Sequence, residues 1–178
     1  MVAQQDNYRR AGFELAWHNR RFKGWGHEAE ATPDARVVPL SALPFDALVA
    51  YDDAFHPAPR PAFLQSWIQM PQSHALGWWE GGALRGYGVL RACREGCKLA
   101  PLCADTPAIA KTLFEALCSR VPSTEPVFMD VPDGNAVAVE LALHQGMEAT
   151  FSTARMYRGP APRLALSRLY GLTTLEVG

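Results

Sequence analysis

Three features are scarce in this 178-residue sequence, and each scarcity excludes a class of protein. The longest apolar runs, such as residues 46–51, are much shorter than the roughly 20 residues that a membrane-spanning helix needs. The formal net charge is −1, whereas a dedicated nucleic-acid-binding protein is usually strongly basic. The N-terminus is polar and carries no apolar signal region. The sequence therefore predicts a cytoplasmic protein with neither membrane nor nucleic-acid partners.

Cysteine is also scarce, and the chain has only Cys93, Cys97, Cys103 and Cys118. Cys93 and Cys97 flank a turn at residues 94–96, so their thiols can face each other. No pair of His or Cys residues with zinc-finger spacing accompanies them. We expect reduced thiols that pack as small apolar groups, and no metal; a metal site or a disulfide is the alternative.

A short block of sequence occurs twice. Residues 11–14 read Ala-Gly-Phe-Glu and residues 19–24 read Asn-Arg-Arg-Phe-Lys-Gly. Near the other end, residues 145–148 read Gln-Gly-Met-Glu and residues 154–159 read Ala-Arg-Met-Tyr-Arg-Gly. Both copies have a glycine, a large apolar residue and a glutamate, then an arginine, an aromatic residue, a basic residue and a glycine. Repetition over such a distance indicates a duplicated domain.

The position of the first copy predicts the domain organisation. We interpret residues 1–24 as the last strand of a preceding domain, residues 25–36 as a linker and residues 37–178 as a whole domain. The strand within 1–24 is amphipathic and lacks its original sheet, so we expect an edge that needs a partner. Three outcomes remain open: it docks on the following domain, it pairs with a second copy as a homodimer, or it is disordered.

Apolar periodicity and turn residues predict the order of the remaining elements. Gly81-Gly82 is a hairpin signal, and Thr106-Pro107 is typical of a helix start. Strands are predicted at 13–22, 37–40, 75–80, 83–92, 97–102, 127–131 and 148–157, with helices at 44–55, 62–70, from 106 and between 135 and 146, and a short helix or strand within 164–177. This order predicts an α+β (mixed α/β) fold, with a central mixed, mostly antiparallel sheet flanked by helices.

Particular residues at the joints of this order resemble the GNAT superfamily of acyl-CoA-dependent N-acyltransferases. Residues 85–90 (Arg-Gly-Tyr-Gly-Val-Leu) are similar to its third strand, and residues 99–102 (Leu-Ala-Pro-Leu) to its fourth. Val131, Asn135, Leu141 and the pair Gly146-Met147 resemble the following strand, helix and strand. The resemblance covers roughly residues 36–160. More narrowly, the chain resembles the second domain of bacterial tandem-GNAT proteins of the YitH type.

The resemblance implies acetyl-CoA as co-substrate and a small-molecule or protein amine as acceptor, without a metal. The pantetheine would lie where the fourth and fifth strands splay apart, and the pyrophosphate at the start of the next helix. The implied cofactor-binding residues are Leu99, Pro101, Leu102, Ala108, Ile109 and Asn135. The family's glycine-rich phosphate loop is absent from residues 103–108, where Pro107 removes one N–H group and Asp105 adds a negative charge. This helix start therefore predicts either a simple N-cap or a phosphate site.

Acyl transfer also needs a base and an acid. The base candidates are Asp130 and Glu80, each of which has a purely structural alternative. The resemblance places acceptor-binding residues at Asp52 and His56. Arg60, as a partner for a carboxylate, and Arg155 and Tyr157, on one face of a strand, are further candidates for substrate binding, each with a structural alternative. The tyrosine that is the general acid in many GNAT enzymes is replaced by Ala142, whereas the first copy of the repeat has Tyr8 at that position.

Two functions are therefore predicted: an N-acetyltransferase, or a non-catalytic GNAT-fold domain that binds the acceptor, completes a partner domain or dimerises.

Overall fold

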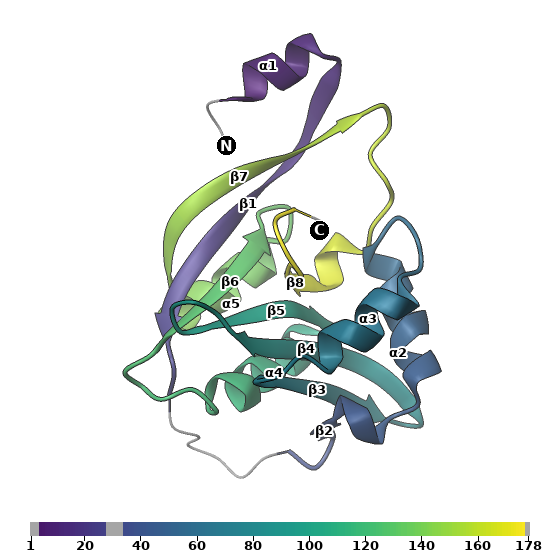
Figure 1. The fold of residues 1–178 in the computed structure, drawn as a ribbon, viewed down its shortest axis with the longest axis vertical. Coiled ribbons are helices and arrows are strands. Elements are labelled where there is room, and N and C mark those ends of the chain that lie inside the picture. Colours follow the sequence, from purple (N-terminus) through teal and green to yellow (C-terminus); the bar gives the residue numbers. More distant parts are fainter. Residues whose placement is uncertain (1–3, 28–33, 177–178) are drawn as a thin grey trace.

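A single twisted sheet forms the centre of the protein (Figure 1). The computed structural model describes residues 4–27 and 34–176. Seven strands follow the order β2-β3-β4-β5-β6-β1-β7, and β8 pairs with β5. Among the strands of the described residues, only β5 and β6 are parallel, and the other neighbouring strands are antiparallel. The strands are β1 (Phe13–Trp25), β2 (Val37–Pro39), β3 (Ser73–Glu80), β4 (Ala83–Ala92), β5 (Cys97–Ala104), β6 (Pro126–Pro132), β7 (Glu148–Arg158) and β8 (Leu169–Gly171). This arrangement confirms the predicted α+β class.

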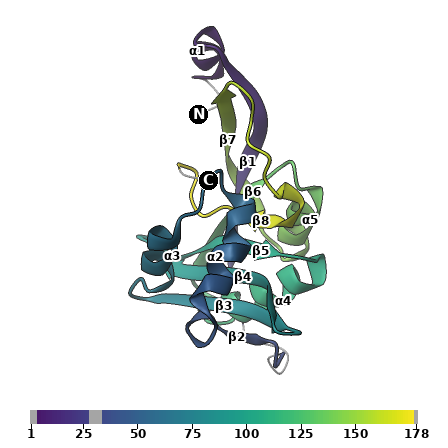
Figure 2. The ribbon, with the colours of Figure 1, turned by 90° about the vertical axis from the view of Figure 1, so that its right-hand side faces the viewer.

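Helices cover both faces of the sheet, as Figure 2 shows. On one face lie α2 (Phe45–Asp52) and α3 (Pro61–Ile68), and on the other lie α4 (Pro107–Cys118) and α5 (Ala136–His144). The short helix α1 (Gln5–Arg10) lies away from this body. The 3-10 turns are η2 (Leu40–Ala42), η3 (Asp53–Phe55) and η4 (Leu166–Arg168). Within residues 4–27 and 34–176, no helix has the length and apolarity that crossing a membrane requires.

Two glycines in β4 set the distance between the sheet and α4. A Cβ atom on Gly88 would lie 2.7 Å from a methyl group of Leu117, and one on Gly86 would lie 2.8 Å from Ile109. Any larger residue would therefore push α4 away from the core. The alternation of glycine with Tyr87 in this strand places the aromatic ring on the opposite face, where it is fully buried.

The N-terminal strand is an internal strand of this domain. β1 pairs with β6 over Asn19–Trp25 and with β7 over Phe13–Lys23. Of the three predicted outcomes, docking on the following domain is therefore the one in the structure, and β1 is not an edge that is open to a symmetry mate. Its second half lies in the core, where Phe22 is 1% exposed. The predicted linker lies partly outside the described residues, since 28–33 are not among them.

Replacement of Phe22 by alanine tests this internal position. We expect Phe22→Ala to lower the free energy of unfolding by about 3–5 kcal/mol, because the ring leaves a cavity between the sheet and its helices. Leu15→Ala, on the same strand but 39% exposed, is the matched control and should cost less than about 1 kcal/mol. Urea unfolding followed by tryptophan fluorescence measures both. Equal losses in the two variants would show that β1 is not part of the core.

Candidate functional site

The candidate site is the place where β5 and β6 diverge. The two strands pair only at Cys97 with Val127 and at Lys98 with Phe128. Beyond these pairs β8 lies in the split: Leu102 and Cys103 of β5 pair with Gly171 and Leu169. On the other side, the N–H of Leu172 donates to the carbonyl oxygen of Asp130 on β6 at 2.8 Å. The C-terminal segment of the chain thus closes the split with backbone hydrogen bonds to both strands.

Side chains hold the start of this segment. The Asn135 amide donates to the Leu169 carbonyl oxygen at 3.1 Å, and the Arg168 guanidinium is 2.5 Å from Asp105 at the start of α4. Asp105 also accepts from the Tyr51 hydroxyl at 2.9 Å. Leu169, Tyr170 and Leu172 are at most 3% exposed, so β8 belongs to the core of the domain.

The residues predicted to bind the cofactor gather around this split, but their contacts are with the chain itself. Leu99 and Leu102 are fully buried, and Pro101 between them is buried and offers no N–H group. Asn135 binds β8 and also caps α5 through its side-chain oxygen. The N–H of Ile109 donates to the Thr106 hydroxyl at 3.3 Å, so the predicted N-cap is present. Ala108 lies exposed on the first turn of α4.

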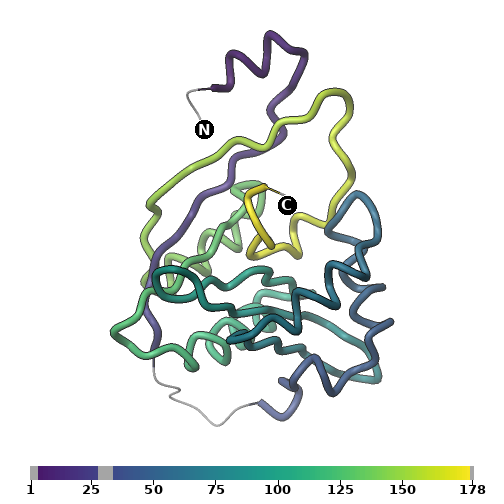
Figure 3. The backbone as a smooth tube through the Cα atoms, viewed as in Figure 1, coloured from purple at the N-terminus to yellow at the C-terminus, as the bar shows by residue number. Residues whose placement is uncertain are grey.

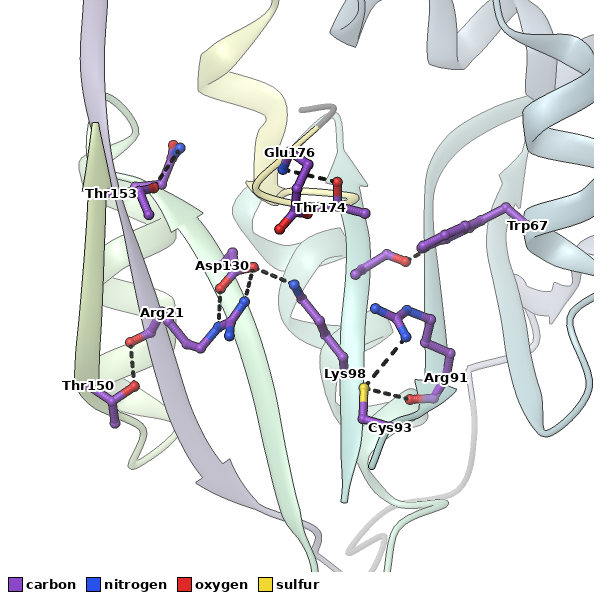
Figure 4. Close-up of polar contacts among 12 residues, drawn as sticks. Arg21, Trp67, Arg91, Cys93, Lys98, Asp130, Thr150, Thr153, Thr174 and Glu176 are labelled. Carbon is purple, nitrogen blue, oxygen red and sulfur yellow. Dashed lines mark hydrogen bonds and ion pairs between the residues drawn. The ribbon is translucent and has the colours of Figure 1, made fainter. Parts of the chain in front are cut away.

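Asp130 lies at the base of the split in a cluster of charged side chains (Figure 4). Its carboxylate accepts two hydrogen bonds from Arg21 of β1, at 2.7 and 3.0 Å, and one from Lys98 of β5. Burial opposes its ionisation, but the hydrogen bonds from Arg21 and Lys98 outweigh burial, and the pKa of Asp130 is lowered. Glu176 of the C-terminal segment also raises the pKa of Arg21, after the larger contribution of Asp130. A carboxylate that is held ionised between two cations is a weak base.

Glu80, the second base candidate, is not brought near Asp130. It ends β3, whereas Asp130 is on β6, and β4 and β5 lie between these strands. Its carboxylate accepts from Arg36 at 2.8 Å, and this hydrogen bond is the main reason why the pKa of Glu80 is lowered. The structure therefore places Glu80 in an exposed surface pair.

Three residues predicted to bind the acceptor do come together. Arg60 donates two hydrogen bonds to Asp52, at 2.7 and 2.9 Å, and a nitrogen of His56 lies 3.6 Å from the same carboxylate. The Tyr87 hydroxyl donates to Asp52 as well, and Arg60 reaches the Thr173 hydroxyl at 3.0 Å. Asp52 is 1% exposed. The cluster therefore connects α2 and β4 to the C-terminal segment, and its polar atoms are committed to one another.

Arg155 and Tyr157, the other two predicted acceptor residues, lie on β7. Tyr157 packs against the Trp17 ring of β1, with ring centroids 5.9 Å apart, and Arg155 is paired with Trp17 in the strand register. Both residues are half-buried. The charge of Arg155 also contributes to lowering the pKa of His56, after burial and the charge of Arg60.

Sequence reasoning missed Arg21, Lys98 and the position of β8 in the split, although it predicted a short helix or strand within 164–177. Lys98 had a signal: it is the only charged residue in the otherwise apolar strand 97–104, and a buried lysine needs an anionic partner. Arg21 and β8 had none, because their partners are distant in the sequence. The cysteines are free thiols, and no cluster of His, Cys, Asp and Glu suited to a metal occurs in the described ranges.

The comparisons with known proteins agree with this geometry. Residues 48–171 match the family profile of the acetyltransferase (GNAT) domain. The chain therefore belongs to the GNAT acetyltransferase family. It is 27% identical to the holothin acyltransferase of Pseudoalteromonas sp. (strain SANK 73390), over all 178 residues of this chain and 60% of that protein. The chain thus spans about three fifths of this relative's length.

Solved structures show the same fold. A protein of Pyrococcus horikoshii described as an acetyltransferase superposes with a TM-score of 0.78 at 19% identity, over 100% of this chain and 58% of its own. The GCN5-related N-acetyltransferase of Sphaerobacter thermophilus superposes with a TM-score of 0.60 at 14% identity, over 86% of this chain and 55% of its own. In the structure of this chain, the split between β5 and β6 is where the family resemblance places the pantetheine.

Asp130→Asn tests the charged cluster. We expect a loss of about 3–5 kcal/mol in the free energy of unfolding, since two cations then lie near a neutral amide. Glu95→Gln, which breaks the exposed pair with Lys23, is the matched control and should cost less than about 1 kcal/mol. Because the pKa of Asp130 is lowered on folding, its contribution is present above about pH 4 and is lost as the pH falls further. Urea unfolding from pH 7 to pH 3 should show this loss only in proteins that retain Asp130.

His56→Gln tests the second cluster. Burial, followed by the charge of Arg60, lowers the pKa of His56 from 6.5 to about 4. The unfolded chain therefore binds a proton between pH 6.5 and pH 4 that the folded chain does not, and stability falls as the pH drops through this range. We expect His56→Gln to flatten the stability profile between pH 6.5 and 4, as measured by thermal unfolding. A profile with unchanged slope would mean that His56 is not held neutral.

Proposed function

We propose that this chain is a non-catalytic acetyltransferase-fold domain of an acyl-CoA-dependent N-acyltransferase. The observation that carries the proposal is the position of β8, which lies in the β5–β6 split with hydrogen bonds to both strands. A pantetheine chain would need the same backbone groups. The family membership and the 27% identity to an acyltransferase support an acyl-transfer function for the whole protein.

The chemical groups around the split support the same conclusion. Acyl transfer to an amine needs a donor that polarises the thioester carbonyl and a base that takes the ammonium proton. Pro101 supplies no N–H group at the centre of β5, and Asp130 is neutralised by two cations. Ala142 lies where many relatives have an acid, and it is fully buried. Among the described residues, these three positions therefore do not supply a carbonyl donor, a free base or an acid.

One observation favours a second function, in which this domain itself transfers an acetyl group from acetyl-CoA. Arg85 and Arg168 both lie beside Asp105 at the start of α4, at 3.7 and 2.5 Å. Cations at a helix start are suited to a pyrophosphate. In the structure, however, both arginines are paired with Asp105, and Arg168 is part of the segment that fills the split. Binding of acetyl-CoA would require this segment to move.

Calorimetric and thermal-shift titrations with acetyl-CoA distinguish the two functions. We expect no binding up to about 1 mM, and hence no rise in the unfolding temperature, because β8 occupies the split. Asp105→Asn frees Arg85 and Arg168 while retaining the shape of the side chain, and we expect the same negative result. Acetyl-CoA binding by the unaltered chain would contradict the proposal. Binding by Asp105→Asn alone would show that Asp105 excludes the cofactor, through its charge at α4 or through its ion pair with Arg168 beside β8.

A further inference from the structure

Strand β2 is too short to cover the whole edge of the sheet. It has three residues, which pair with residues 76–78 of β3, whereas β3 begins at Ser73. Among the strands of the described residues, the first three residues of β3 pair only with β4. β2 lies at the end of the molecule opposite to helix α1 (Figures 1 and 3). The sheet edge beyond the end of β2 is therefore left to elements other than strands.

A cavity of about 410 Å³ lies beside this part of the edge. The chain leaves the sheet after Pro39, the last residue of β2, and continues through η2 into α2. The walls of the cavity come from η2, α2, α3, the start of β3 and the segment after α4. Its volume lies within the range of about 300–1,000 Å³ that is typical of small-molecule sites.

The cavity has an apolar floor. Eight of its fourteen lining residues are apolar, and the least exposed of them are Leu40, Leu48 and Leu76, at 2–5%. Gly77 of β3 allows η2 to pack closely on the sheet: a Cβ atom there would lie 2.8 Å from a methyl group of Leu40 and 3.0 Å from one of Leu43. The cavity is therefore suited to the aliphatic part of a ligand.

The other lining residues are polar, and their charge has one sign. Arg120 is the only lysine or arginine among them, and no aspartate or glutamate lines the cavity. Within residues 4–27 and 34–176, the Arg120 guanidinium has no hydrogen-bond or ion-pair partner. Gln65 and Gln69, one turn apart on α3, add two amide groups. Burial, followed by the charge of Arg120, lowers the pKa of His74, so this imidazole is neutral at pH 7.

We propose that this cavity binds an aliphatic monocarboxylate. The carboxylate lies beside Arg120, whose planar guanidinium matches its two oxygens, and the Gln65 and Gln69 amides are further donors. The alkyl chain lies on the leucines of the floor. One unpaired cation without an anion favours a ligand with a single negative charge over an amine or a neutral alcohol.

This site is separate from the split between β5 and β6. The cavity lies at β3, and β4 lies between β3 and β5 in the sheet. The residues of the buried network around Asp52 do not line it. The proposal therefore does not depend on whether the split binds acyl-CoA.

Titration of the isotope-labelled chain with sodium octanoate, followed by amide NMR spectra, tests the proposal. We expect saturable shifts in residues 39–48, 65–76 and around 120, with a Kd of about 1 mM or lower. Each CH₂ group removed from the ligand should weaken binding about fourfold, because less apolar surface is buried. 1-Octanol and octylamine have the same chain without the negative charge, and they should bind at least about tenfold more weakly.

Variants of Arg120 test the role of the cation. Arg120→Gln should weaken octanoate binding at least about tenfold and leave 1-octanol binding unchanged, whereas Arg120→Lys, which keeps the charge, should lose less. Arg120 is exposed, so these variants should fold, and the same NMR spectra verify this. Arg94→Gln, in the exposed turn after β4, is the matched control and should bind octanoate as the unaltered chain does.

Four results would overturn the proposal. The first is an absence of saturable shifts up to about 10 mM octanoate. The second is equal affinity for octanoate and 1-octanol, and the third is unchanged octanoate binding by Arg120→Gln. The fourth is a set of shifts centred on β8 and the β5–β6 split, which would place the ligand at the other site.

Discussion

The divergence of β5 and β6 is the constraint on which this structure depends. Two parallel strands that separate inside a protein leave backbone N–H and C=O groups without partners, and such groups are costly when buried. Here β8 provides the partners, with contacts to Leu102 and Cys103 on one side and to the carbonyl of Asp130 on the other. In a family that places a cofactor in this split, the same requirement would be met by the amides of a pantetheine. In this chain, the backbone of the β8 segment therefore provides the hydrogen-bond partners that the backbone groups of β5 and β6 need in the split.

Polar contacts hold the C-terminal segment, which contains β8, in the split between β5 and β6. Arg168 binds Asp105 before β8, and Thr173 binds Arg60 after it. Arg60 belongs in turn to the buried network around Asp52. The Arg168–Asp105 pair and the network around Asp52 thus join the C-terminal segment to the start of α4, to α2 and to the sheet. In the network around Asp52, replacement of Asp52 or Arg60 leaves the other charge largely buried without its counter-charge, so this network stabilises the domain only as a complete unit.

Local features of the fold could be predicted from the sequence, and long-range ones could not. The hairpin at Gly81-Gly82, the N-cap at Thr106 and the α+β class follow from residues that are close together in the chain, and the structure has all three. The sequence predicted where the site lies, but not the contacts that its residues make. Leu99 and Leu102 do line the split, but β8, which pairs with Leu102, is about 70 residues away, and the short helix or strand predicted within 164–177 had no predicted partner. Asp130 was identified as a base candidate because the two cations that neutralise it, Arg21 and Lys98, were not recognised as its neighbours. They lie on other strands, and the sequence did not reveal the order of these strands in the sheet.

The sheet order also has a consequence for how the chain folds during synthesis. β1 is synthesised before both of its neighbours in the sheet, β6 and β7, which follow it by more than 100 residues. Until then Phe22 has no core to enter, and the nascent chain carries an unpaired amphipathic strand while residues 26–125 are synthesised. Sheets closed by such distant partners fold slowly and are vulnerable to aggregation. Efficient production of this protein should therefore depend on chaperones that shield the N-terminal strand until the last third of the chain has emerged.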